Sequence, residues 1–271
     1  MTSTISVIVS TYNRPDALRM VLNALCHQID NDFEIIVADD GSDYKTKQVV
    51  DQYHKINKVS IRHVWQPDEG FRLARIRNLA VKESIGKYII FLDGDCIPPT
   101  DFIGNHRKLA ESGWAVIGQR ILCSQSFTRE LLEKNFEWSE GKGQTILNLT
   151  LLNLRNKINR LVPAFRLPLG SLRKKNPTNW EKVRGCNWAM WKRDYAMING
   201  SDEAFEGWGA EDKDVAVRLI NAGIKLKDGR LYSHVFHLWH PIASRENEKR
   251  NVSLVKERIL SKTIYPIKGM Y

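Results

Sequence analysis

Short apolar runs alternate with amphipathic stretches along the first hundred residues. The runs at 5–10 (ISVIVS), 33–38 (FEIIVA) and 88–92 (YIIFL) are apolar or β-branched at most positions. Such runs predict short strands that are buried on both faces, as in a parallel sheet. The run at 59–64 (VSIRHV) predicts a further, weaker strand.

The stretches between these runs carry the helical period. We expect Asn13 to cap a first helix and Pro15 to open it. Its apolar positions, spaced by three and four, are Leu18, Val21, Leu22 and Leu25. A second helix buries Leu73, Ile76 and Ala80. This alternation predicts an α/β fold with a mostly parallel, doubly wound sheet flanked by helices.

Polar clusters follow three of the expected strands, and they read STYNR (10–14), ADDGS (38–42) and DGD (93–95). Ligands of doubly wound sheets bind beyond the carboxyl ends of the strands. Because the three clusters would converge on one edge of the sheet, together they indicate a binding site there, although each alone is weak evidence.

Asp93 and Asp95 flank Gly94, and the triplet has two readings. Asp and Gly are common turn formers, but a turn explains one aspartate more easily than two. Two carboxylates at a rigid strand end can instead hold a hard divalent cation, which usually bridges phosphate oxygens. Taken alone, the triplet fits a metal site and a polar turn equally well.

The other two clusters leave similar alternatives open. Asp39 and Asp40 begin a frequent type of turn, but a carboxylate there could also accept the imide N–H of a uracil ring. Tyr12 could stack on that base or simply contribute to packing. Three arginines, Arg72, Arg75 and Arg77, are expected on one helix, either as a solvated basic face or as a pyrophosphate clamp.

The second half of the chain carries FEGWGAEDKD (205–214), which predicts a helix beginning near Glu211. Glu211 and Asp212 would complement the helix dipole, and this is a sufficient structural role for one of them. With Trp208 beside them, they also suit a sugar stacked on the indole and a carboxylate that takes a hydroxyl proton.

Three histidines, His234, His237 and His240, lie in strand-like sequence at 233–241. In a continuous strand, His234 and His240 would share a face and His237 would take the other, so at most some of them could bind one metal. A buried histidine satisfied by hydrogen bonds is the alternative.

Composition narrows the class of protein. The 271 residues carry a formal charge of +10, four scattered cysteines without a CxxC pair, and no stretch of membrane-spanning length or signal-peptide pattern. We expect a cytoplasmic protein with an anionic partner. We also expect one domain over 1–271, with a first half at 1–120 and a smaller C-terminal lobe within 121–271.

No acidic residue occurs between Glu140 and Glu181, a segment rich in lysine, arginine and leucine. Cations mixed with apolar side chains suit the interface of an anionic membrane. A solvated basic face and an active-site lid are the alternatives for this insertion at 141–180. The membrane interpretation predicts peripheral binding to the cytoplasmic face of the inner membrane.

The ordered set STYNR, VADDGS, EGFRLARIRN, FLDGDCIP, GCNWAM, GWGAED and HLWHP followed by RENE resembles inverting family 2 glycosyltransferases of the GT-A fold. It is similar above all to the hexosyltransferase modules of bacterial chondroitin and hyaluronan polymerases, with a galactosyltransferase-like C-terminal segment. The resemblance covers about residues 5–248, although 125–180 is poorly covered. The set as a whole is far more specific than any single motif.

The resemblance implies a UDP-sugar donor, a glycan or lipid-linked glycan acceptor, Mn²⁺ or Mg²⁺, and a role in bacterial lipopolysaccharide or capsule biosynthesis. It implies that Asp212 is the catalytic base and that Glu211 and Trp208 bind the acceptor. Asp95, Asp93 and His237 would bind the metal, with His234 as a rival to His237. The nucleotide sugar would contact Thr11, Tyr12, Arg14, Asp39, Asp40, Arg72, Arg77, Asp93, Gly94 and Asp95. Lys213 departs from the family pattern and leaves the acceptor preference open.

Two other classes fit less well. A sugar nucleotidyltransferase would carry a glycine-rich phosphate loop after the first strand, and STYNRPD has no glycine. A nucleic-acid-binding protein would explain the charge, but the acids in DDGS, DGD and ED would repel a phosphate backbone.

Overall fold

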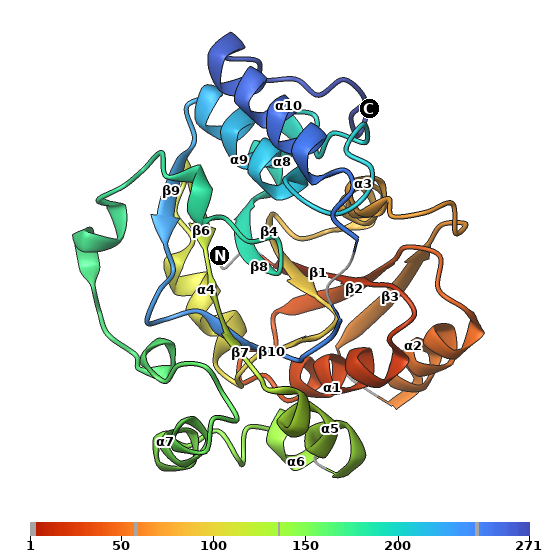
Figure 1. The fold of residues 1–271 in the computed structure, drawn as a ribbon, viewed down its shortest axis with the longest axis vertical. Coiled ribbons are helices and arrows are strands. Elements are labelled where there is room, and N and C mark those ends of the chain that lie inside the picture. Colours follow the sequence, from red (N-terminus) through yellow and green to blue (C-terminus); the bar gives the residue numbers. More distant parts are fainter. Residues whose placement is uncertain (1–3, 57–58, 135, 242–243) are drawn as a thin grey trace.

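A seven-stranded sheet forms the centre of the computed structural model, which describes residues 4–56, 59–134, 136–241 and 244–271 (Figure 1). The strand order is β3-β2-β1-β4-β8-β6-β9. The strands are β1 (Ile5–Thr11), β2 (Phe33–Asp39), β3 (Ser60–Trp65), β4 (Tyr88–Asp93), β6 (Trp114–Ile117), β8 (Asn187–Trp191) and β9 (Lys225–Asp228). Strands β1 to β4 are parallel, and only β8 runs antiparallel to its neighbours β4 and β6, which confirms the expected mostly parallel sheet.

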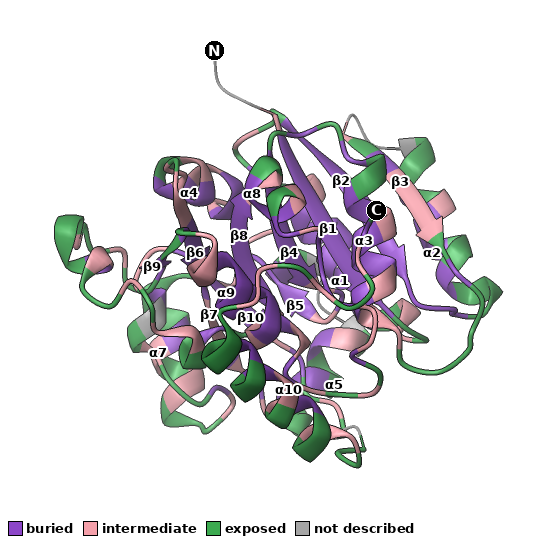
Figure 2. Cartoon of the chain, turned by 90° about the horizontal axis from the view of Figure 1, so that it is seen from above, coloured by how far each residue is buried: buried purple, intermediate pink, exposed green. Residues whose placement is uncertain are grey.

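Helices cover both faces of the sheet, since successive side chains of a strand point to opposite faces. Val7 and Val9 of β1 join one apolar cluster with α1 and α2, whereas Ile8 joins another with α3 and α9. Figure 2 shows the strands buried between these layers. The helices are α1 (Pro15–Cys26), α2 (Tyr44–Ile56), α3 (Leu73–Glu83), α4 (Phe102–Leu109), α5 (Gln125–Lys134), α6 (Phe136–Ser139), α7 (Ile146–Leu154), α8 (Lys192–Met197), α9 (Glu211–Asn221) and α10 (Glu248–Ser261).

A second, three-stranded sheet lies beside the ends of β1 and β4. It consists of β5 (Cys96–Ile97), β10 (His234–His237) and β7 (Gln119–Leu122), with β10 in the middle. His237 pairs with Cys96 in register. This small sheet therefore brings the histidine segment next to the DGD triplet, which lies about 140 residues earlier in the sequence.

The start of α1 differs from the expectation. The capping residue is Arg14, not Asn13, and no side chain caps this end. Asn13 adopts a left-handed backbone conformation (φ 47°), and its carboxamide oxygen accepts a hydrogen bond from the Asp43 backbone N–H at 2.9 Å. The prediction for Asn13 was wrong because its side chain joins two neighbouring strand-end loops and does not bond the helix.

The segment between α7 and β8 contains three short 3₁₀ helices, at Val162–Ala164, Gly170–Lys174 and Trp180–Lys182. It runs along the side of the molecule opposite α2 and α3 (Figure 1). Among the described residues, no helix combines the length and the hydropathy required to cross a bilayer.

A buried ion-pair network joins α9 to α10 and to the C-terminal tail. Asp214 Oδ2 accepts a hydrogen bond from Arg218 Nε at 2.7 Å, and both side chains are fully buried. Asp214 Oδ1 lies 3.3 Å from Arg258 Nε, and Arg258 also bonds Asp202, whose carboxylate accepts from the backbone of Ile267. The network fixes the helix that carries Glu211 and Asp212.

We predict that Asp214→Asn lowers the free energy of unfolding by about 3–5 kcal/mol, because it leaves the Arg218 guanidinium buried without its counter-charge. Urea denaturation followed by circular dichroism measures this change. The control is Asp51→Asn, which removes an exposed ion pair with Lys47 and should leave the midpoint unchanged. Equal midpoints for the two variants would contradict a structural role of the network.

Candidate active site at the strand ends

The register of the parallel strands aligns their polar ends. Ser10 of β1 pairs with Asp93 of β4, and Thr11 pairs with Asp39 of β2. Thr11 is nearly buried, and its hydroxyl has no hydrogen-bond partner among the described residues. The three polar clusters thus lie side by side at one edge of the sheet, as the sequence predicts.

Gly94 is required by the close approach of two backbones. Its N–H donates to the Ser10 carbonyl at 2.7 Å. A Cβ at this position would lie 2.9 Å from that oxygen and 3.2 Å from Thr11 Cβ, which is shorter than side chains tolerate. The glycine therefore lets the triplet fold against β1, with Asp93 and Asp95 on either side of the contact.

Arg77 of α3 lies at the centre of the site and is only 3% exposed. Its Nη2 donates to Asp93 Oδ1 and to the Gly185 carbonyl, each at 3.1 Å, and its Nε donates to Ser10 Oγ at 3.2 Å. Its Nη1 lies 3.9 Å from Glu211 Oε1. A solvated basic face is therefore the wrong description of this side chain, which is packed among the acids of the site.

The other two arginines of the expected helix face behave differently. Arg72 precedes α3 as its capping residue, and its Nη1 forms an ion pair with Glu69 at 2.5 Å. Arg75 Nη1 donates to Gln66 Oε1 at 2.8 Å. The three arginines thus do not share one surface, and their proposed contacts with a nucleotide stay predictions.

Glu211 and Asp212 begin α9, directly after a turn with unusual backbone angles. Gly207, Gly209 and Ala210 all have positive φ. Asn251 of α10 holds this turn by donating to the Gly209 carbonyl at 2.9 Å. The turn aims the first residues of α9 at the strand ends, where Gly185 N–H donates to Asp212 Oδ2 at 2.7 Å.

Burial and mutual repulsion raise the pKa values of these acids. Burial, opposed by Arg77 and reinforced by Asp95, raises the pKa of Asp93 to about 6. Burial and the neighbouring Asp212 raise the pKa of Glu211 to about 7. Burial also raises the pKa of Asp212, against the hydrogen bonds it accepts from the backbone. Glu211 Oε2 has no partner among the described residues, so a bound hydroxyl could donate to it.

Asp95 faces two histidines. Its carboxylate oxygens lie 3.8 Å from His237 Nε2 and 3.4 Å from His240 Nε2, and the two imidazole rings are 5.2 Å apart. Asp95, Cys96 and His237 offer an oxygen, a sulfur and a nitrogen atom that all lie within 4.8 Å of one another. Cys96 follows the DGD triplet directly, but no motif identified it as a possible metal ligand.

The expected arrangement of the histidines was wrong. β10 ends at His237, so the chain turns before His240 and brings that ring to the same side as His237. His234 is buried on the other side of the strand, where Arg166 Nη1 lies 2.7 Å from its Nδ1. Burial and Arg166 lower the pKa of His234 to about 3, so it is a neutral structural histidine.

The DDGS turn is held by its own contacts. Asp39 is fully buried, accepting from Ser42 N–H at 2.8 Å and lying 2.9 Å from His63 Nε2. Asp40 accepts from the Arg72 N–H at 2.8 Å and from Gln66. Both carboxylates thus have partners, Asp39 within its own turn and on β3, and Asp40 at the two ends of the segment 66–72.

Tyr12 and Arg14 complete the first cluster. The Tyr12 ring is half exposed, and its hydroxyl donates to Asp68 Oδ2 at 2.9 Å. Arg14 Nε pairs with Asp16 at 3.1 Å. Trp208 is partly exposed, and the Arg245 guanidinium lies 5.0 Å above its ring, so one face of the indole is covered.

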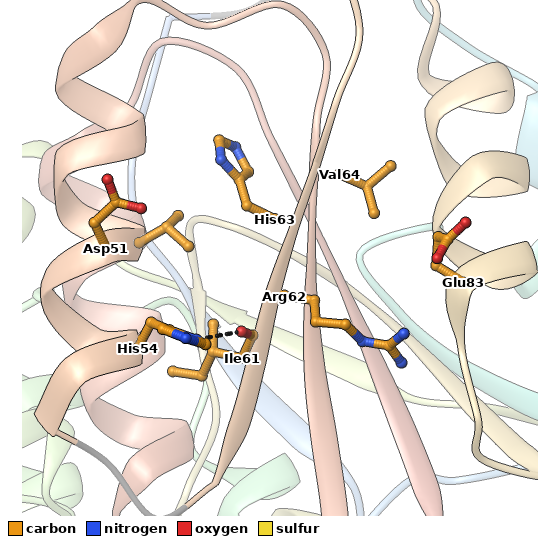
Figure 3. A pocket seen from close by; sticks show the side chains of 8 residues that line it. Asp51, His54, Ile61, Arg62, His63, Val64 and Glu83 are labelled. Atoms are coloured by element: carbon orange, nitrogen blue, oxygen red, sulfur yellow. Dashed lines mark hydrogen bonds between the residues drawn. The ribbon is translucent and has the colours of Figure 1, made fainter.

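A surface pocket of about 500 Å³ lies elsewhere, at the outer strand β3 between α2 and α3 (Figure 3). Val50, Asp51, His54, Ile61, Arg62, His63, Val64 and Glu83 line it. None of these residues belongs to the sequence-predicted site. His63 lines this pocket, and its Nε2 lies 2.9 Å from Asp39 Oδ2. No motif in the sequence predicts this contact, since β3 is recognisable only as a weak strand.

The sheet is mixed, and carboxylates lie at the ends of β2 and β4 and at the start of α9, at the edge where α/β sheets of this kind bind ligands. The sequence model of glycosyl transferase family 2 matches residues 6–169, which is more than half of the chain. The chain therefore belongs to glycosyl transferase family 2 and is a glycosyltransferase. Residues 169–241 match a second model, described as the N-terminal domain of galactosyltransferase.

Relatives and solved structures agree with this assignment. The chain is similar to chondroitin synthase from Escherichia coli, with 26% identity over 81% of this chain and 32% of that protein. Hyaluronan synthase from Pasteurella multocida is 28% identical over 85% of this chain and 24% of that protein. The chain thus spans a third or less of either relative.

The fold resembles that of S. aureus TarS 1–349 in complex with UDP-GlcNAc, with a TM-score of 0.59, 17% identity, and coverage of 95% of this chain and 66% of that one. It also resembles the mannosyltransferase PcManGT from Pyrobaculum calidifontis in complex with GDP-Man and Mn²⁺, with a TM-score of 0.58, 16% identity, and coverage of 97% and 63%. These likenesses confirm the expected GT-A architecture.

We predict that Gly94→Ala lowers the free energy of unfolding by about 1–3 kcal/mol and weakens nucleotide binding, because its Cβ forces the triplet away from β1. Calorimetric titration with UDP and thermal melts measure the two effects. The matched control is Gly104→Ala in α4, where a Cβ would meet nothing closer than 3.9 Å. Normal UDP binding by Gly94→Ala would show that the close approach does not position the site.

Proposed function

We propose that this glycosyltransferase is a metal-dependent, inverting hexosyltransferase, which moves a hexose-type sugar from a UDP-sugar to a hydroxyl group of a glycan. One observation carries the proposal. Asp93, Glu211 and Asp212 converge around the buried guanidinium of Arg77, with Asp95 beside Asp93 across Gly94, at the edge of the sheet where such folds bind ligands.

The donor set around Asp95 fits a divalent cation. A carboxylate oxygen and an imidazole nitrogen within 4.8 Å of each other are suitable ligands for Mn²⁺, and carboxylates also suit Mg²⁺. We propose Asp95 and His237 as ligands, with Asp93 nearer the ribose. A cation held there would neutralise the charge of the diphosphate leaving group.

Asp212 is the proposed catalytic base. Its position at the start of α9 is fixed by Gly185 N–H and by the Lys213 N–H at 2.8 Å, so the carboxylate has little freedom to rotate. Its raised pKa lies nearer neutral pH than that of an ordinary aspartate, which favours proton acceptance from a hydroxyl group. The deprotonated acceptor oxygen would attack the anomeric carbon from the face opposite the nucleotide, and the C–O bond to UDP would break.

Glu211 and Trp208 are the proposed acceptor contacts. The unpartnered Glu211 Oε2 can accept a sugar hydroxyl, and the partly exposed Trp208 ring can stack on a sugar face. On the donor side we propose Thr11, Tyr12, Arg14, Asp39, Asp40, Arg72 and Arg77. Because Asp40 accepts hydrogen bonds from Gln66 and from the Arg72 N–H, we propose that donor binding at Asp40 displaces the segment 66–72.

The proposed setting is bacterial lipopolysaccharide or capsule biosynthesis at the cytoplasmic face of the inner membrane, where a lipid-linked glycan would be the acceptor. The likeness to chondroitin and hyaluronan synthases supports polysaccharide synthesis. The donor is tested by incubation with a series of UDP- and GDP-sugars and measurement of the released nucleoside diphosphate.

We predict that Asp212→Asn lowers kcat by roughly 10²–10⁴ while UDP affinity stays near normal, because the amide keeps the shape but cannot accept a proton. Released UDP measures kcat, and calorimetric titration measures the affinity. In the unchanged enzyme, activity at saturating metal should fall with decreasing pH, starting above the ordinary aspartate value of 3.8, because the base acts only when ionised. A variant with normal kcat, or with lost UDP binding, would refute the assignment.

We predict that a chelator abolishes transfer and that Mn²⁺ or Mg²⁺ restores it. His237→Ala should weaken metal-dependent UDP binding more than His234→Ala does, because His234 contacts Arg166 and not Asp95. Asp95→Ala should abolish this binding. Binding is measured by titration of UDP with and without the metal. Full activity in excess chelator would overturn the metal assignment, and the reverse order of the histidine variants would assign the ligand to His234.

A further inference from the structure

Helix α7 carries an apolar stripe on the side that faces solvent. Leu147, Leu151 and Leu154 follow one another at spacings of four and three, so they lie on one face of the helix. Their exposed fractions are 71%, 42% and 73%. The opposite side is apolar as well, since Leu149 is buried and Leu152 contacts the same core. A surface helix normally presents polar residues outward, so this second apolar face is unusual.

The chain beyond α7 extends the exposed apolar surface. Val162, Phe165, Leu167 and Leu172 are all exposed. We call these four residues, together with Leu147, Leu151 and Leu154, the apolar rim. Exposed apolar side chains gathered along one segment mark a candidate surface for another molecule.

The segment that presents the apolar rim is fixed to the rest of the protein. Thr145 caps α7 by accepting a hydrogen bond from the Asn148 N–H at 3.3 Å. Ile158 is buried, and Leu161 contacts the core. The rim is therefore a built surface with a defined inner side.

Four cations of the segment hold it in place and are therefore not available to an outside partner. Lys157 pairs with Glu130, Arg166 with Asp101 and Lys174 with Glu111. Arg173 is buried and donates to the carbonyls of Leu167, Asp228 and Arg230.

Three other cations remain available. Arg155, Arg160 and Lys175 are exposed, and within the described part of the chain none of them forms an ion pair. No acidic residue lies between 141 and 180. Within 141–180 every charged side chain is a cation, and the acids Glu130, Asp101 and Glu111 that approach from elsewhere pair with other cations of the segment. Arg155, Arg160 and Lys175 therefore complement a negatively charged partner.

We propose that the apolar rim is a membrane-docking surface, which inserts its leucines and Phe165 into the interface of an anionic bilayer while Arg155, Arg160 and Lys175 contact lipid phosphates. With nine residues, α7 is too short to span a bilayer, which takes about 20, but it suits an orientation parallel to the surface. An anionic bilayer supplies the negative charge that complements these cations. A protein partner or a second copy is an outcome that the test separates from a bilayer. The biological role of this docking surface rests on the proposed lipid-linked acceptor. The vesicle test of the surface does not depend on that acceptor.

The test is co-flotation of the full chain with vesicles of phosphatidylglycerol and phosphatidylethanolamine. A triple variant should bind these vesicles about a hundredfold or more weakly, since burial of one leucine changes a partition constant by about tenfold. Its changes are Leu147→Gln, Leu151→Gln and Leu154→Gln. Glutamine keeps the helix propensity. The matched control is Ile259→Gln with Leu260→Gln on α10, at the opposite end of the molecule, where exposed apolar residues stand beside acids (Figure 1).

The cations are tested separately. Arg155, Arg160 and Lys175 changed to Gln should reduce binding to anionic vesicles, and the same change at Lys249, Arg250 and Lys256 of α10 should not. An increase of NaCl from about 0.1 M to about 1 M shortens the Debye length from about 10 Å to about 3 Å, so it should release wild-type protein that the charges hold. Vesicles of phosphatidylcholine alone should bind more weakly.

Donor hydrolysis, followed by released UDP, separates this inference from the proposed function. The rim variants should hydrolyse the donor at the wild-type rate, whereas Asp212→Asn should float with vesicles like wild type. Wild-type protein that ignores anionic vesicles at low salt, or rim variants that float normally, would overturn the docking surface. Formation of a dimer that the leucine variants abolish would assign the rim to a second copy instead.

Discussion

The Arg77 guanidinium is the contact on which the site depends. Asp93, Glu211 and Asp212 approach one another at the strand ends, where burial raises the pKa of each carboxyl group and the Arg77 guanidinium opposes that rise. Arg77 donates hydrogen bonds to Asp93 at the end of β4 and to the Gly185 carbonyl in the loop before β8. Its Nη1 lies 3.9 Å from Glu211 at the start of α9. Arg77 thus offsets part of this charge and joins three segments, two of which, around Gly185 and Glu211, lie more than a hundred residues after it in the sequence.

The architecture around this contact separates rigid from movable parts. α9 is fixed by the buried network of Asp214, Arg218 and Arg258, so Glu211 and Asp212 have a stable frame. The segment 66–72 instead bonds the strand-end clusters through a few contacts, namely those of Gln66 and Arg72 with Asp40 and that of Asp68 with Tyr12. Movement of this segment would leave the acids beside Arg77 in place, because none of these contacts involves them.

Local patterns were enough to predict β1 to β4, α1, α3, α9 and the convergence of STYNR, ADDGS and DGD, because hydrophobic period and strand direction act over short distances. They did not predict β6, β8 or β9 of the same sheet. Contacts between distant segments were not accessible in the same way. The burial of Arg77 depends on acids from two segments, around Asp93 and at the start of α9, and Arg166 pairs with Asp101 across 65 residues. The position of His240 depends on where β10 ends, which the sequence 233–241 does not reveal. Composition likewise does not reveal that Lys157, Arg166 and Lys174 form ion pairs, so it overstates the unpaired positive charge of 141–180.

The small sheet has a consequence for ion binding. Leu238 N–H donates to the Asp95 carbonyl at 2.9 Å, and His237 pairs in register with Cys96. The spacing of the two proposed ligands is thus set by backbone hydrogen bonds, and not by how far two flexible side chains can reach. The conformational entropy needed to bring them together is lost when the chain folds, so little of it remains to be lost when an ion arrives. A pair fixed in this way would select ions by ligand distance, because the backbone resists adjustment to an ion of the wrong size.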